Sequence, residues 1–210
     1  MAYNTEIKNE DIKMSSIVSE FVKINFYDKY VKDLEIVVDK KRQVQGIDTI
    51  FLIDGKKCYC DEKSAVRYRN IKTFALELSF LNKFDELMNG WFISDRMVND
   101  YYLFIWIDKS LSDTTDRKII RQINDITEAE IALVKKEDIF NYLNKLGWTK
   151  EKLLQKSERI RMEGDRNFGD LLYDGCRFTY SEMLSEKPIN ILLPRKEIRK
   201  FAIKDIIIKK

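Results

Sequence analysis

The chain has 210 residues, 44% hydrophobic and 35% charged, a balance that supports a substantial core and excludes a disordered chain. Its formal net charge of +3 excludes a general field strong enough to indicate a polyanionic partner. It has no histidine, which excludes Ser-His-Asp and Cys-His catalysis, histidine-ligated zinc and nucleases with a histidine base. Hydrolytic chemistry would therefore use carboxylates, lysine, tyrosine, serine or a hard metal ion, and carboxylates favour Mg²⁺ or Mn²⁺.

The three cysteines are Cys58, Cys60 and Cys176, which form neither a disulfide framework nor a zinc set. We expect Cys58 and Cys60 to be a buried, reduced pair on one face of a strand. No signal peptide opens the sequence, and no apolar run approaches the roughly 20 residues of a membrane span. Two prolines and seven glycines leave little room for a linker. These features predict one cytoplasmic domain over residues 1–210, without a membrane anchor.

In the first part of the chain, apolar residues recur at helical spacing from about residue 9 to residue 30. Glu35–Asp39 is typical of a short strand. Two further strands are predicted at Ile47–Ile53 and Lys57–Cys60. The Asp54-Gly55 pair between them is a strong signal for a two-residue hairpin turn.

Further along, Thr73–Phe80 alternates between apolar and small or polar residues, which predicts a strand with one buried face. Tyr101–Ile107 is apolar on both faces, as in a central strand. The remaining predicted elements are a strand at Glu130–Val134, helices at Glu137–Leu146 and Thr149–Met162, a strand at Ile189–Leu193 and a basic helix from Arg195. The order predicts an α/β (α+β) domain with a central mixed sheet and flanking helices.

The predicted hairpin brings chemically active residues together. If Asp54 and Gly55 form the turn, Ile53 faces Lys56 and the register places Asp48 opposite Asp61. Opposed residues on antiparallel strands have Cβ atoms about 4.5–5.5 Å apart and share a face. Lys63 lies two residues beyond Asp61 and projects from that same face.

Two carboxylates held this close repel each other unless a cation neutralises them. A divalent ion bridging Asp48 and Asp61 resolves the conflict, and Lys63 can then stabilise charge on a phosphate or help activate a water. The alternative is a set of exposed strand-end charges, with Lys63 in a surface ion pair worth at most about 1 kcal/mol. The Asp/Glu-any-Lys pattern begins at six places in this chain, so only its position at the end of an apolar strand singles out Asp61.

Other charged residues fit either a site or a structural role. Glu77 lies on a neutral strand face, where a buried carboxylate needs a partner, so a site role and a structural ion pair are equally compatible. Glu62 faces away from Asp61 and is expected to be structural. Arg67, Arg69 and Lys72 directly follow the motif and are candidates for phosphate contacts.

Basic residues also cluster elsewhere, and each of these clusters is expected to be a solvated face. They are Lys40, Lys41 and Arg42, and, near the C-terminus, Arg195, Lys196, Arg199 and Lys200.

Gly46-Ile47-Asp48, the hairpin and Asp61-Glu62-Lys63, preceded by an amphipathic helix, resemble the PD-(D/E)XK (restriction-endonuclease-like) nuclease superfamily. A bacterial and phage branch of that superfamily is similar over four motifs: Gln45–Asp48, Asp61–Lys63, Thr73–Leu78 and Gly90-Trp91. The resemblance covers a core of about residues 10–110 and leaves residues 111–210 as a C-terminal elaboration. It implies a helix followed by a meander of strands within a mixed sheet.

The resemblance implies that Asp48 and Asp61 are metal ligands and that Lys63 is the catalytic lysine. Ile47 stands where the motif name has proline, a position that varies in the superfamily. An additional glutamate from the first helix is implied, for which Glu20 is the candidate, with Asp28 and Glu10 as alternatives.

The implied activity is Mg²⁺- or Mn²⁺-dependent hydrolysis of phosphodiester bonds, as in an endonuclease. DNA is the expected substrate because of the resemblance alone, RNA is also compatible, and a homodimer would suit cleavage of both strands. The alternative is a catalytically silent nuclease-fold protein that binds nucleic acid, or inhibits a partner in phage–host or mobile-element conflict.

Overall fold

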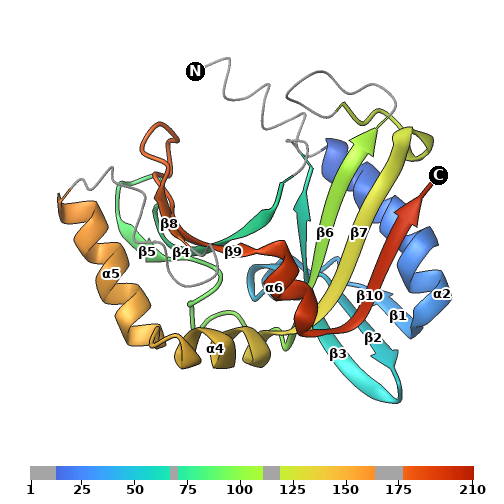
Figure 1. The fold of residues 1–210 in the computed structure, drawn as a ribbon, viewed down its shortest axis with the longest axis horizontal. Helices are drawn as coiled ribbons and strands as arrows, with labels where there is room; N and C mark the ends of the chain where they lie inside the picture. Colours follow the sequence, from blue (N-terminus) through green and yellow to red (C-terminus); the bar gives the residue numbers. More distant parts are fainter. Residues whose placement is uncertain (1–12, 67–70, 111–118, 164–176) are drawn as a thin grey trace.

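The computed structural model describes residues 13–66, 71–110, 119–163 and 177–210, which form a mixed α/β structure with two sheets (Figure 1). The six-stranded sheet has the order β1-β2-β3-β6-β7-β10. Its strands are β1 (Lys32–Ile36), β2 (Thr49–Ile53), β3 (Lys56–Ala65), β6 (Tyr101–Ser110), β7 (Ile126–Lys135) and β10 (Ala202–Lys209). The four-stranded sheet, in the order β5-β4-β9-β8, contains β5 (Leu87–Asn89), β4 (Thr73–Leu81), β9 (Ile189–Pro194) and β8 (Arg177–Tyr180).

The six-stranded sheet is mixed because β3 and β6 run parallel while its other neighbouring strands are antiparallel. The hairpin has the predicted register, with Ile53 opposite Lys56 and Thr49 opposite Cys60. Residues Tyr101–Ile107 of β6 are all buried, which confirms the prediction of a central strand.

One face of this sheet is covered by the first helix. Residues 13–30 are helical, with a π-helical stretch at Lys23–Tyr27 and a last turn, α2, at Asp28–Tyr30. Phe21 and Phe26 are fully buried against apolar residues of β2, β3, β6 and β7. The apolar residues that recur at helical spacing in the sequence therefore form the helix face that packs on the sheet.

The opposite face of the six-stranded sheet shares a core with the four-stranded sheet and the later helices. This cluster includes Tyr102 and Trp106 of β6, Leu76 of β4 and Ile191 of β9. The helices that contribute are α4 (Lys136–Lys145), α5 (Lys150–Glu163) and α6 (Arg195–Lys200). Thr149 caps α5 as predicted, since its Oγ1 accepts from the backbone N–H of Lys152 at 3.4 Å. None of the helices described is long and apolar enough to span a membrane.

Some elements differ from the sequence-based prediction. The first strand is β1 at Lys32–Ile36 rather than Glu35–Asp39, because Lys32 pairs with Leu52 and Ile36 with Thr49. The basic turn after it forms a short helix, α3 (Lys40–Val44). The strands β5, β8 and β10 were not predicted, and the helix from Arg195 ends at Lys200, where β10 follows and pairs with β7.

Candidate active site

Asp48 lies immediately before β2 and is fixed against β3. Its backbone N–H donates to the carbonyl of Cys60 at 2.9 Å, and its Oδ2 accepts from the backbone N–H of Glu62 at 2.9 Å. The Asp48 side chain therefore takes the place of a backbone acceptor where the ladder between the two strands ends. This contact holds the carboxylate beside that of Asp61, as the hairpin register predicted.

Asp61 and Lys63 project from the same face of β3. The Lys63 Nζ donates to Asp61 Oδ1 at 2.6 Å and lies 4.7 Å from the centroid of the Trp91 ring. The Asp61 side chain is 3% exposed and that of Lys63 is 22% exposed. Asp61 Oδ2 is buried and has no hydrogen-bond partner. An unpaired buried carboxylate oxygen is costly, so this atom lacks a contact that a cation or a hydrogen-bond donor would supply.

The electrostatics of Asp61 follow from this geometry. Burial raises the pKa of Asp61 to about 7, against the opposing effect of Lys63, and the nearby Asp48 carboxylate raises it further. At neutral pH, and without a bound cation, the Asp61 carboxyl is therefore only partly ionised. A divalent ion would favour the ionised form of Asp61.

Glu62 lies on the opposite face of β3, as predicted, and has structural partners there. Its Oε1 accepts from the Tyr27 hydroxyl at 2.7 Å, and its Oε2 lies 3.4 Å from Ser19 Oγ. Burial raises the pKa of Glu62, and the Tyr27 hydrogen bond opposes the shift. This carboxylate ties β3 to the first helix.

Glu77 on β4 approaches the site from the second sheet. Burial raises its pKa, which a hydrogen bond from the Trp91 backbone and the charge of Lys63 oppose. A Cβ at Gly90 would lie 2.3 Å from the Glu77 carbonyl oxygen, so only glycine permits this close approach. No ion pair joins Glu77 to a basic side chain among the residues described here. The Gly90-Trp91 pair thus places Trp91 between Glu77 and Lys63.

Other candidates from the sequence are not gathered at this site. Glu20 is exposed on the first helix, and Lys72 is exposed. Arg67 and Arg69 lie outside the described residues, as does Glu10, while the other alternative, Asp28, is exposed on the helix. Across the described ranges, no three Asp, Glu or Cys side chains are close enough together to hold a metal ion. Of the residues that the structure describes, Asp48 and Asp61 would thus be the only carboxylate ligands of the ion, a number that Mg²⁺ accepts when waters and substrate phosphates complete its shell.

The structure adds residues that could not be selected from the sequence alone. Tyr102 pairs in register with Asp61, is completely buried, and its hydroxyl has no hydrogen-bond partner. The buried Asn99 donates from Nδ2 to the carbonyl of Tyr101 at 3.0 Å and lies 3.5 Å from the Lys136 Nζ. Tyr102 belongs to a uniformly apolar strand, so its position beside Asp61 follows only from the β3–β6 pairing.

No family model, curated protein or solved structure matches this chain. Fold and side-chain geometry therefore carry the functional argument.

The raised pKa of Asp61 predicts a pH dependence of stability in chelator. Between about pH 4 and pH 7 the folded protein keeps a proton that the unfolded chain releases, so the free energy of unfolding falls as pH rises. We expect the wild type to lose about 2–4 kcal/mol relative to Asp61→Asn across this range. Urea unfolding of the wild type and of Asp61→Asn between pH 4 and pH 7 measures this loss. Because both proteins contain Glu62, the difference between their free energies of unfolding reports Asp61 alone. Parallel pH profiles would show that Asp61 is ionised throughout.

Proposed function

We propose that this chain is a Mg²⁺-dependent nuclease of the PD-(D/E)XK type that hydrolyses phosphodiester bonds of DNA. The observation that carries the proposal is the set of Asp48, the buried Asp61 and Lys63 on one face of the hairpin, with Asp61 Oδ2 unpaired. The choice of DNA rests on the resemblance to the superfamily.

The order of elements supports the same proposal. A helix over residues 13–30 is followed by the meander β1-β2-β3, with Asp48 opening β2 and Asp61 and Lys63 on β3. This is the arrangement that the resemblance implies. The next strand of the sheet, β6, is parallel to β3, and the connection between them passes through β4 and β5 of the second sheet.

The residues present fit a divalent cation. Asp48 and Asp61 would hold it, because the repulsion between them and the unpaired Oδ2 are both relieved by a positive ion. Bound there, the ion supplies Lewis-acid stabilisation of the phosphate and a more acidic water. Lys63 can exchange its contact with Asp61 for a phosphate oxygen and stabilise charge that develops during hydrolysis.

A second candidate function is a nuclease-fold protein that binds nucleic acid, or inhibits a partner protein, without cleavage. Among the side chains that the structure describes, no third carboxylate joins Asp48 and Asp61 in a group that could hold a metal ion, which favours this candidate. The two functions differ in whether the site must bind metal to act.

Cleavage of supercoiled, linear duplex and single-stranded DNA, in Mg²⁺, Mn²⁺ or chelator, tests the proposal. We expect metal-dependent cleavage by the wild type and a loss of about a hundredfold or more in Asp48→Ala, because a metal ligand is removed. Glu158→Ala is the matched control. Glu158 is exposed on α5, so this substitution removes one negative charge at a position far from the motif in the sequence. Cleavage that persists in chelator, or in Asp48→Ala, would contradict the proposal. Binding of DNA without cleavage in either metal would support the second candidate.

A further inference from the structure

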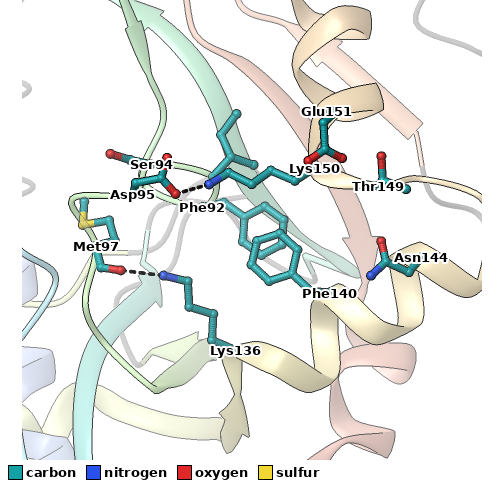
Figure 2. A pocket seen from close by; sticks show the side chains of 11 residues that line it. Phe92, Ser94, Asp95, Met97, Lys136, Phe140, Asn144, Thr149, Lys150 and Glu151 are labelled. Carbon is teal, nitrogen blue, oxygen red and sulfur yellow. Dashed lines mark hydrogen bonds and ion pairs between the residues drawn. The ribbon is translucent and has the colours of Figure 1, made fainter.

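Apart from the candidate active site, the structure has a pocket of about 550 Å³ (Figure 2). It is formed by the segment that follows Trp91, by one side of α4 along its length and by the start of α5. Phe92 and Phe140 stack in its wall, with ring centroids 4.5 Å apart and an interplanar angle of 11°. The pocket is distinct from the Asp48–Asp61 pair, since neither residue lines it.

Two lysines bring positive charge into this pocket. Lys136 Nζ donates to the carbonyl of Met97 at 2.9 Å, and its other polar neighbour is the amide oxygen of Asn99. Both partners are neutral. Burial lowers the pKa of Lys136 and the nearby Lys150 lowers it further, against the opposing effect of the Asp61, Asp100 and Asp95 carboxylates. The two ammonium groups therefore repel each other, a conflict that an anion between them would remove.

The acidic residues at the pocket are weak competitors for such an anion. Lys150 is paired with Asp95, whose side chain is 90% exposed on the loop (Figure 2). Glu151 accepts hydrogen bonds from its own backbone N–H and from Thr149, which lower its pKa. An exposed ion pair such as Asp95–Lys150 contributes at most about 1 kcal/mol and can be exchanged for a better anion.

The segment that lines the pocket also contacts the turn that precedes Asp48. Asp61 acts on Lys136 through space and favours its charged form, so the two side chains are within electrostatic reach. A Cβ at Gly46 would lie 3.0 Å from Asn99 Oδ1 and 3.1 Å from Met97 Sδ. The turn that leads into Asp48 therefore packs directly on the segment that lines the pocket.

We propose that this pocket binds a backbone phosphate of a nucleic-acid strand whose neighbouring phosphate lies at Asp48 and Asp61. Lys136 and Lys150 hold the phosphate, and Asp95 occupies Lys150 in the free protein until the phosphate displaces it. The partly exposed ring of Phe140, which stacks on the buried ring of Phe92, provides an apolar wall for the sugar. This inference rests on the proposed function, because it assumes a nucleic-acid substrate at the candidate site.

Binding of a fluorescein-labelled single-stranded oligonucleotide in chelator, followed by anisotropy over a range of salt concentrations, tests this pocket without cleavage. We expect Lys150→Gln to weaken binding about five- to tenfold at low salt and to lower the salt slope by about one. Asp95→Asn should act in the opposite direction and tighten binding by about threefold or more, because it frees Lys150. Lys145→Gln is the control, an equal loss of charge at an exposed position of α4 outside the pocket.

Competition with inorganic pyrophosphate distinguishes two possible sources of the bound phosphate group, a nucleic-acid strand and a free phosphate compound. Weak competition supports a strand phosphate, whereas displacement at low pyrophosphate concentration, unaffected by oligonucleotide length, would assign the pocket to a free phosphate compound and overturn the proposal. Equal affinities for Lys150→Gln, Asp95→Asn and Lys145→Gln would overturn it as well, as would a wild type that binds no oligonucleotide. Because cleavage plays no part in this assay, these results are independent of whether the metal site is active.

Discussion

Asp61→Asn should reduce Mg²⁺-dependent DNA cleavage by about a thousandfold or more, while the protein remains folded. Asparagine keeps the shape of the side chain but removes the charge that a divalent ion needs. The variant also removes a buried carboxylate that lies beside Asp48 and has one unpaired oxygen. We therefore expect its stability in chelator, above about pH 7, to equal or exceed that of the wild type. Single-turnover cleavage rates and urea unfolding measure the two effects.

The neighbouring carboxylate provides the control for this prediction. Glu62→Gln changes the same charge one residue further along β3, but on the opposite face, where a glutamine oxygen can still accept from Tyr27. We expect this variant to retain cleavage within a few-fold and to bind Mg²⁺ as the wild type does. If Asp61→Asn cleaves as fast as Glu62→Gln, the site that we assign is not the catalytic one. If both variants and the wild type are inactive but bind DNA, the binding function is favoured.

The hairpin with the candidate site could be predicted from the sequence because its register is decided locally. Asp54 and Gly55 both adopt positive φ, at 49° and 74°, and such a two-residue turn fixes which residues face each other. Once Ile53 faces Lys56, the positions of Asp48, Asp61 and Lys63 follow from alternation along the strands. The burial of Asp61 and its unpaired oxygen do not follow from the register, because other elements create them.

The features that the sequence did not predict depend on contacts between distant segments. Lys136 donates to the carbonyl of Met97, 39 positions away in the sequence, and both residues line the pocket between α4 and the segment after Trp91. The strand β10 exists as part of a sheet because β7 offers it an edge, with Ile206 opposite Ile131. The spacing of apolar residues in a short stretch of sequence indicates an amphipathic segment, but it does not indicate which distant segment packs against it. Strands as short as β5 and β8 have too few residues to show such a spacing.

The basic cluster near the C-terminus also depends on contacts between distant segments, and it leads to a prediction about stability. Arg195 was expected on a solvated face, but its guanidinium bonds both oxygens of Asp108, at 2.8 and 2.5 Å, and lies 2.6 Å from Glu130. Arg199 also reaches Glu130, at 2.8 Å. The side chains of Arg195, Asp108 and Glu130 are about 15–16% exposed, and this network joins α6 to β6 and β7. The charges that hold Arg195 come from residues 87 and 65 positions away.

We expect Arg195→Met to lower the free energy of unfolding by about 3 kcal/mol, because it leaves two partly buried carboxylates close together without their main cation. Methionine retains an unbranched apolar stem but loses the guanidinium, which lies 5.3 Å from the centroid of the Trp106 ring, so the loss includes this cation–π contact as well as the ion pairs. Urea denaturation with linear extrapolation measures the change, and m values equal to that of the wild type would support a two-state comparison.

Arg42→Met is the matched control for Arg195→Met. Arg42 also pairs with a carboxylate, Glu35, but the two side chains are 35% and 54% exposed. Water screens this pair, so its loss should cost less than about 1 kcal/mol. Adding Asp108→Asn and Glu130→Gln to Arg195→Met should recover part of the lost stability, because the repulsion left behind is removed. If Arg195→Met costs no more than Arg42→Met, α6 is held to the six-stranded sheet by its apolar contacts, and the charge network only follows the fold.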